Sequence, residues 1–231
     1  MTMLQFDSEG FEEKAGYCFK DKGLLRSALS HKSYVNELKI NTYPHYERLE
    51  FLGDAVLELV VSDHLYKKRK DLSEGDMTKL RAALVCEPTL ADCARLIDLP
   101  SFILVGKGEE EQGSRFRDSI VSDVFEAVIG AVFLDGGMRA AKKFIETYVL
   151  KDIDKKKLFY DAKSILQMKT QKENKELSYR VINESGPDHM KEYEVEVSLN
   201  GVPIAKGKGR SKKAAEQNAA VNALTADQDK E

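Results

Sequence analysis

Three carboxylates at helical spacing stand in a segment that is otherwise almost wholly apolar. Glu47, Glu50 and Asp54 are three and four residues apart, so on a helix they lie along one face. The residues around them are mostly apolar: Leu49, Phe51, Leu52, Ala55, Val56, Leu57, Leu59, Val60 and Val61. A helix that is apolar nearly all round is usually buried, and an unpartnered buried carboxylate is costly or becomes protonated. The segment therefore requires a cation or a basic partner.

A second acidic pair, Asp123 and Glu126, lies three residues apart in another strongly apolar segment. If the two helices pack together, four acids converge, and they cannot all stay ionised without a multivalent cation between them. Carboxylates without His or Cys favour Mg²⁺ or Mn²⁺, and such a site suits hydrolysis of a phosphodiester. The alternative is that each acid forms a salt bridge with an arginine such as Arg48, Arg81 or Arg117.

The charge of the chain is divided unevenly along its length. The 231 residues allow one large domain or two ordinary ones, and their formal net charge is -3. Residues 1–154 contain 21 basic and 27 acidic residues, giving -6, whereas residues 155–231 contain 15 and 12, giving +3. We therefore expect the two parts to have different electrostatic roles.

The composition of the chain also indicates the cellular compartment in which it is expected. The chain has no apolar stretch of about 18 residues, and residues 1–10 carry acids without a basic-then-apolar pattern. We therefore expect no signal peptide, no membrane partner and a cytoplasmic location. Cys18, Cys86 and Cys93 show neither CxxC pairing nor zinc spacing, and they are predicted to be free thiols of the core.

Helical periodicity dominates as far as residue 150. Predicted helices cover residues 11–29, 46–68, 77–85, 89–97, 119–134 and 140–150. Gly136 and Gly137 are expected to end the fifth of these helices. The polar, glycine-flanked residues 106–113 are predicted to form a surface loop, and the charged residues 151–160 a linker. The prediction for residues 1–150 is thus an all-α domain.

A different pattern follows the linker. Residues 161–174 have helical period, whereas residues 179–185 and 192–199 have the alternation of strands. Asn200-Gly201 is a strong hairpin signal, residues 203–209 form the returning strand, and an alanine-rich helix covers residues 211–224. This α-β-β-β-α order predicts a small, independent α+β domain over residues 161–228.

The acidic segments resemble a known family. The sequence E-R-L-E-F-L-G-D-A at residues 47–55 resembles the signature of ribonuclease III, and D-V-F-E at residues 123–126 resembles its second acidic motif. Further matches are H-x-S-Y from His31 and G-D-M-T-K-L-R-A from Gly75, and the resemblance covers about residues 10–225. It implies an all-α endonuclease domain.

The resemblance also implies roles for individual acids. Glu50, Asp54, Asp123 and Glu126 would be the metal-binding catalytic set, with Asp54 and Glu126 most directly tied to the chemistry. Two further acids match family residues that position the scissile strand near the dimer interface: Glu47 and Glu74. Glu58 also faces the acidic side, but the resemblance gives it no role. Gly53 is predicted to be a point of close packing between helices.

The C-terminal domain resembles a double-stranded-RNA-binding domain. The matching segments are D-x-K-S-x-L-Q from Asp161, G-P-D-H from Gly186 and K-K-A-A-E from Lys212. The resemblance implies minor-groove contacts from the first helix and the Gly186 loop, and phosphate contacts from the last helix. The implied RNA-binding residues are Ser164, Gln167, Gln171, His189, Lys212 and Lys213.

Together these features predict a Mg²⁺-dependent endoribonuclease that cuts double-stranded RNA as a homodimer, with no small-molecule cofactor besides the metal. The resemblance implies products with 5′-phosphates and short 3′ overhangs, and a role in ribosomal, messenger and small-RNA processing. One alternative is an RNA-binding protein that keeps both domains but does not cleave. Another is a nuclease of single strands or of DNA, which the C-terminal domain makes the weaker prediction.

Overall fold

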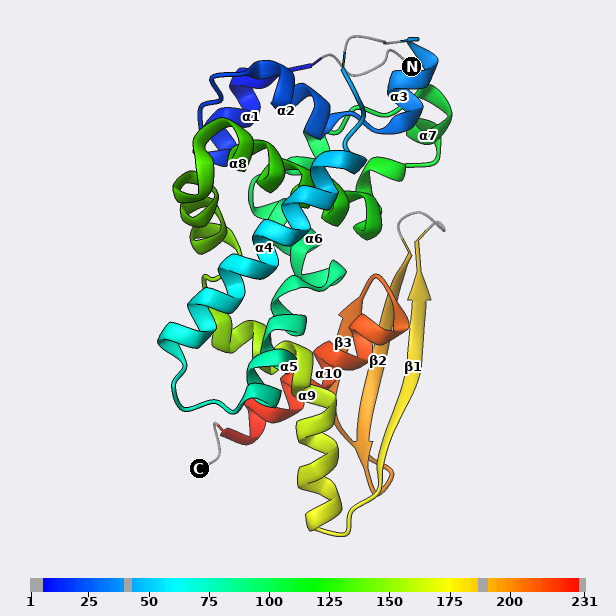
Figure 1. Cartoon of the computed structure of the whole chain (residues 1–231). Helices are drawn as coiled ribbons and strands as arrows, with labels where there is room; N and C mark the ends of the chain where they lie inside the picture. Colours follow the sequence, from blue (N-terminus) through cyan, green and yellow to red (C-terminus); the bar gives the residue numbers. More distant parts are fainter. Residues whose placement is uncertain (1–5, 40–42, 187–190, 229–231) are drawn as a thin grey trace. The chain divides into compact units, whose positions relative to one another are not determined.

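The computed structural model describes residues 6–39, 43–186 and 191–228, without the side chains of residues 154–161, 227 and 228. Contacts divide the chain after Ile153 into a helical unit and a smaller α+β unit (Figure 1). Within the described residues, no helix is both long and apolar enough to cross a membrane.

The first unit is built of helices (Figure 1). Its α-helices are α1 (Ser8–Ala15), α2 (Lys22–Leu29), α3 (Lys32–Glu37), α4 (Glu47–Lys68), α5 (Glu74–Val85), α6 (Glu87–Leu96), α7 (Lys107–Glu111) and α8 (Asp118–Tyr148). Two short 3₁₀ turns complete it, η1 (Leu99–Phe102) and η2 (Ser114–Phe116). The most extensive contact between any two of these elements joins α4 and α8.

The core of this unit gathers around α8. Nearly every residue of α8 between Val121 and Val132 is buried, so this helix is surrounded by others as its apolar sequence predicted. Helices α2, α4 and α6 pack against it. Because α8 is enclosed, any polar side chain on it must find a partner or a ligand within the protein.

Short-range signals in the sequence set several helix ends. The Asp21 carboxylate accepts a hydrogen bond from the Gly23 amide at 2.8 Å and so caps α2. Ser73 caps α5 by accepting from the Asp76 amide at 3.2 Å. Gly137 has φ 73°, a left-handed conformation that interrupts α8 where the two glycines were expected to end it.

Helix extends into three segments where the sequence did not predict it. Residues expected to be loop form α3 and α7, and α9 (Ile153–Lys172) begins inside the predicted linker. The charges of residues 151–160 favoured a linker, but no glycine or proline interrupts them and lysine and leucine are good helix formers. The helical backbone of residues 153–160 was therefore not predicted, while the predicted linker and domain limits stay a prediction.

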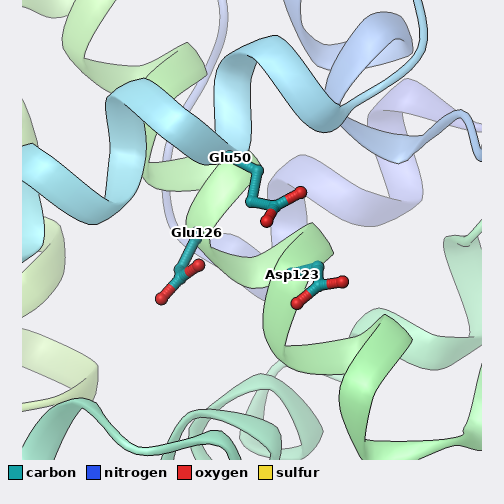
Figure 2. Close-up of side chains that lie close together, drawn as sticks. All are labelled: Glu50, Asp123 and Glu126. Atoms are coloured by element: carbon teal, nitrogen blue, oxygen red, sulfur yellow. The ribbon is translucent and has the colours of Figure 1, made fainter.

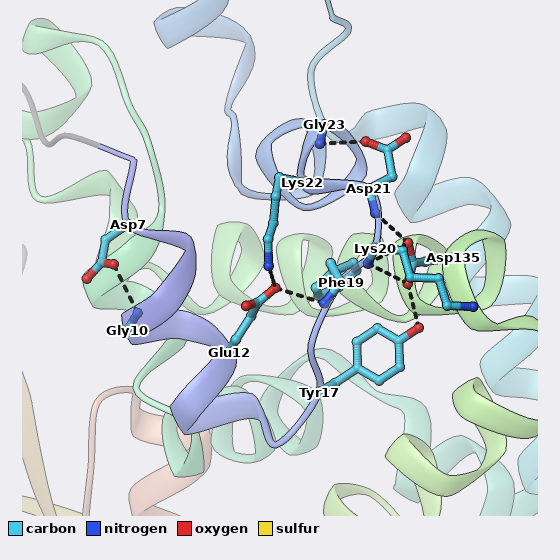
Figure 3. Close-up of polar contacts among 10 residues, drawn as sticks. All are labelled: Asp7, Gly10, Glu12, Tyr17, Phe19, Lys20, Asp21, Lys22, Gly23 and Asp135. Atoms are coloured by element: carbon cyan, nitrogen blue, oxygen red, sulfur yellow. Dashed lines mark hydrogen bonds and ion pairs between the residues drawn. The ribbon is translucent and has the colours of Figure 1, made fainter.

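A single carboxylate fastens the first loop of the unit to α8. Asp135 accepts hydrogen bonds from the backbone amides of Lys20 (3.1 Å) and Asp21 (2.8 Å), and from the hydroxyl of Tyr17 at 2.7 Å (Figure 3). It lies just before the interruption of α8 at Gly137. The α1–α2 connection is thereby held against the end of the straight part of α8.

The second unit has the predicted α-β-β-β-α order. After α9 come β1 (Leu177–Ser185), β2 (Glu192–Leu199), β3 (Val202–Gly209) and α10 (Lys212–Gln228), and the strands form one antiparallel sheet in the order β1-β2-β3. The turn between β2 and β3 is the predicted Asn200-Gly201 hairpin, with both residues at positive φ. Gly207 lets α10 approach the sheet closely, because a Cβ there would lie 2.1 Å from the Ala219 amide nitrogen.

Candidate active site

Two glycines bring α4 and α8 into backbone contact. A Cβ atom on Gly53 would lie 1.8 Å from the backbone oxygen of Glu126, and one on Gly130 would lie 2.3 Å from the backbone oxygen of Leu49. Such distances leave no room for any side chain at either position. The predicted close packing at Gly53 is therefore confirmed, and it fixes the separation of the two acid-bearing helices.

Three carboxylates converge beside this crossing. Glu50 on α4 and Asp123 and Glu126 on α8 each offer an oxygen atom, and the three oxygens lie within 4.8 Å of one another (Figure 2). All three side chains are half-buried. The spacing of the acids in the sequence placed each pair on one helix face, and the contact between the helices brings members of both pairs together.

Burial and mutual repulsion raise the pKa values of these acids. Burial is the main cause that raises the pKa of Glu126 to about 8, and the charge of Asp54 is the next. Burial likewise raises the pKa of Glu50 to about 7, with the charge of Asp123 contributing. The pKa of Asp123 is also raised by burial. A bound cation would lower these pKa values again, since it stabilises the ionised form of each acid.

Arginine salt bridges do not neutralise the cluster. Among the described residues, no basic side chain forms an ion pair with Glu50, Asp123 or Glu126. Arg81 lies 3.7 Å from Glu58 instead, and Arg117 donates to a glutamine oxygen. The donor set contains only carboxylate oxygens, which suits a hard divalent cation such as Mg²⁺ or Mn²⁺. The alternative of paired arginines therefore lacks support for these three acids.

Asp54 lies at the edge of the cluster. Its side chain is exposed, and it is not one of the three carboxylates whose oxygens lie within 4.8 Å of one another. Its charge nevertheless contributes to the raised pKa values of Glu50 and Glu126, so it is a neighbour of both. The four acids predicted from the sequence are thus placed as three gathered carboxylates and one exposed carboxylate beside them.

The other acids singled out in the sequence lie outside the cluster of three carboxylates. Glu47 is exposed and lies 3.6 Å from the Lys32 ammonium. Glu74 begins α5 and accepts a hydrogen bond from the Thr78 hydroxyl at 3.0 Å. Glu58, which had no predicted role, pairs with Arg81. Neither Glu47 nor Glu74 belongs to the gathered cluster.

Two residues of the site were not predicted from the sequence. Gly130 completes the helix crossing, and the Tyr46 hydroxyl donates a hydrogen bond to Asp123 Oδ2 at 3.4 Å. A signal for each was present, because Gly130 follows Glu126 by four residues and Tyr46 precedes Glu50 by four. Residues four apart share a helix face, so both positions point in the direction of the acids.

One face of α4 is exposed despite its apolar composition. Phe51 is 81% exposed, Leu59 is 59% exposed, and Ala55 between them is also exposed. These residues are four apart and form an apolar stripe along the helix. The expectation that α4 is buried nearly all round is therefore wrong for this face in the single chain.

The predicted RNA-contacting residues of α9 lie on the surface of the second unit. Ser164, Gln167 and Gln171 are exposed on one face of this helix. Met168 is 58% exposed and lies on the same side of the helix as these three residues. The predicted contact from His189 lies outside the described residues.

The last helix begins with two exposed lysines. Helix α10 starts at Lys212, whose ammonium lies 5.6 Å from the centre of the Tyr193 ring, and Lys213 follows it. Ser211 accepts a hydrogen bond from the Ala214 amide at 3.1 Å and so caps the helix. Two cations beside the positive end of a helix are unfavourable alone, and a phosphate would offset that cost.

Comparison with known families covers both units. Residues 21–153 match the Ribonuclease-III-like family, and residues 162–226 match the double-stranded RNA binding motif. A ribonuclease 3 from Bacillus licheniformis is 48% identical over 217 residues, which are 93% of this chain and 87% of the relative. One from Listeria monocytogenes is 44% identical over 223 residues, which are 94% of this chain and 97% of the relative.

A solved structure agrees with the helical unit. The nuclease domain of ribonuclease III from Campylobacter jejuni has a TM-score of 0.58 and 44% sequence identity, and the match covers 63% of this chain and 98% of that one. The Campylobacter domain shows structural flexibility in a region involved in dimer formation. The chain belongs to the ribonuclease III family, and it is an endoribonuclease that acts on double-stranded RNA.

Proposed function

We propose that Glu50, Asp123 and Glu126 hold a Mg²⁺ ion, which Mn²⁺ can replace, and that Asp54 joins them as the exposed carboxylate of the site. The observation that carries this proposal is the gathering of three carboxylate oxygens within 4.8 Å. The raised pKa values of Glu50 and Glu126 support it, because repulsion of this kind is relieved by a cation.

The chain's own residues prepare the hydrolysis of a phosphodiester. An ion held here would stabilise charge that develops on the phosphate and would lower the pKa of a bound water. Asp54 is exposed and can therefore reach substrate, whereas Glu126 is fixed by the helix crossing at Gly53. We assign these two carboxylates the most direct contact with the reacting groups. Glu47 and Glu74 would position the scissile strand.

The second unit would hold the duplex. The exposed polar face of α9, with Ser164, Gln167 and Gln171, suits contact with the 2′-hydroxyls of the minor groove. Lys212 and Lys213 at the start of α10 suit the phosphates across the intervening major groove. Such contacts read the A-form shape of RNA more than its sequence. A role for His189 stays a prediction.

A homodimer would cover the apolar stripe of α4. In a twofold dimer the same surface patch of both copies forms the contact, and Phe51 and Leu59 supply an exposed apolar surface for it. A pocket of about 440 Å³ lies on the same helix and is lined partly by Leu52 and Leu134. We expect Phe51→Asp to convert the dimer into a monomer, as measured by light scattering. An unchanged mass would remove the stripe from the interface.

In the dimer, each active centre would cut one strand of the duplex. We propose that the products carry 5′-phosphates and short 3′ overhangs. The cellular substrates would be structured precursors of ribosomal, messenger and small RNAs. Sequencing the ends left on a defined RNA duplex would test the first part directly, and blunt products would contradict it.

The metal site is tested by removing one ligand without changing its shape. Glu126→Gln should lower Mg²⁺-dependent duplex cleavage by at least ~100-fold while duplex binding stays unchanged. Glu146→Gln on the exposed part of the same helix is the matched control and should cleave normally. Cleavage at the unmodified rate by Glu126→Gln would refute the proposed site.

A further inference from the structure

Tyr46 occupies a position that helix capping does not explain. It is the N-cap residue of α4, where Ser, Thr, Asp and Asn are preferred, and its side chain makes no capping hydrogen bond. Its backbone oxygen alone receives the first helical amides, those of Leu49 at 2.8 Å and Glu50 at 3.0 Å. The aromatic side chain is therefore free for another purpose.

That side chain reaches the acidic cluster on the other helix. The Tyr46 hydroxyl donates to Asp123 Oδ2 at 3.4 Å, across 77 residues of sequence. Tyr46 is the one side chain in the described part of the chain that donates a hydrogen bond to Asp123. The phenol of a tyrosine has an ordinary pKa of about 10, so it is protonated at neutral pH and can act as the donor.

The other side of Tyr46 is held by the neighbouring loop. Its amide donates to the Ser30 backbone oxygen at 3.0 Å, and its ring packs against His31 with 5.8 Å between ring centres. The His31 Nδ1 atom lies 2.8 Å from the Ser33 hydroxyl, which accepts from the Gly106 amide at 2.9 Å. Tyr46 is only 5% exposed. The hydroxyl is thus presented by a supported, buried side chain.

We propose that Tyr46 is a positioning residue that fixes the orientation of the Asp123 carboxylate for metal binding. This inference rests on the proposed metal site. A carboxylate that binds an ion through one oxygen leaves the other oxygen free, and a donor on that oxygen selects one orientation of the group. Loss of such a partner typically weakens metal binding ~10–100-fold.

The test removes one hydroxyl and keeps the ring. Tyr46→Phe in the full chain should bind Mn²⁺ ~10-fold more weakly by titration calorimetry. The Mg²⁺ concentration for half-maximal cleavage should rise by a similar factor, and the rate at saturating Mg²⁺ should change little. Tyr17→Phe is the matched control, because it removes another tyrosine–aspartate hydrogen bond, the 2.7 Å bond to Asp135 (Figure 3), and it should leave Mn²⁺ binding unchanged.

A third variant separates the two proposals. If Asp123→Asn weakens Mn²⁺ binding and Tyr46→Phe does not, the metal site stands and the positioning role of Tyr46 is overturned. If Asp123→Asn binds Mn²⁺ like the unmodified protein, the metal site itself is wrong. If Tyr17→Phe weakens binding as much as Tyr46→Phe, the effect is general and the positioning role is also overturned.

Discussion

Substitution of Gly53 by alanine tests whether the helix crossing builds the active site. The added Cβ would lie 1.8 Å from the backbone oxygen of Glu126, whereas ordinary contact begins near 3.4 Å. The helices must therefore separate locally by about 1.6 Å. Because Glu50 and Glu126 sit on opposite sides of this contact, their carboxylates must move apart with them.

The displacement has two measurable effects. Forcing a methyl group into a packed contact costs about 1–3 kcal/mol, and a backbone clash places Gly53→Ala at the upper end of that range. A misplacement of about 1 Å in an active site can cost ~100-fold in rate, so cleavage at saturating Mg²⁺ should fall by at least that factor. Urea unfolding and single-turnover cleavage of a short RNA duplex measure the two quantities.

The matched control is Gly108→Ala. Gly108 lies in α7, and a Cβ atom added there would have no neighbouring atom within 4 Å, so alanine meets open space. Its stability and cleavage rate should equal those of the unmodified protein or rise slightly. The reasoning is refuted if Gly53→Ala matches this control in both measurements. Loss of stability with full activity would show that the crossing supports the fold but does not set the carboxylate spacing.

Three further predictions follow from charges and hydrogen bonds. Glu50 and Glu126 have folded-state pKa values of about 7 and 8, above the ordinary 4.5. Their contribution to stability is therefore fully present below pH 4.5 and is lost as the pH rises through the folded-state values. Thermal unfolding in the presence of chelator should show this loss of stability, and Mg²⁺ should reverse it. Asp135→Ala should lower the unfolding free energy by about 3 kcal/mol in urea, because three donors lose a charged acceptor, and cleavage should persist. Lys212→Ala with Lys213→Ala should weaken duplex binding and reduce its salt slope by about 2, and an unchanged slope would exclude both lysines from the interface.

Helical spacing made the acids predictable, but not the full geometry between them. The period of 3.6 residues places Glu50 and Asp54 on one face whatever the tertiary structure, and the same holds for Asp123 and Glu126. Which of the four gather depends on side-chain rotamers and on the contact between helices. Asp54 is exposed and lies outside the cluster for this reason.

Other differences between the sequence predictions and the structure also have physical causes. The apolar pattern of α4 indicates that its surface is buried. It does not distinguish burial within the chain from burial against another molecule, and for this reason Phe51 was expected in the core. Charge in residues 151–160 favoured a linker, although charged side chains are compatible with an exposed helix. By contrast, the Asn200-Gly201 turn was predictable because few residue pairs adopt its backbone conformation.

Three faces of the helical segment of residues 47–55 serve three different purposes. One face carries Glu50 and Asp54, a second presents Gly53 to the neighbouring backbone, and a third exposes Phe51. A change that suits one face disturbs another, because all three belong to a single short, rigid piece of helix. In a library of random variants selected for cleavage, this segment should therefore tolerate few substitutions.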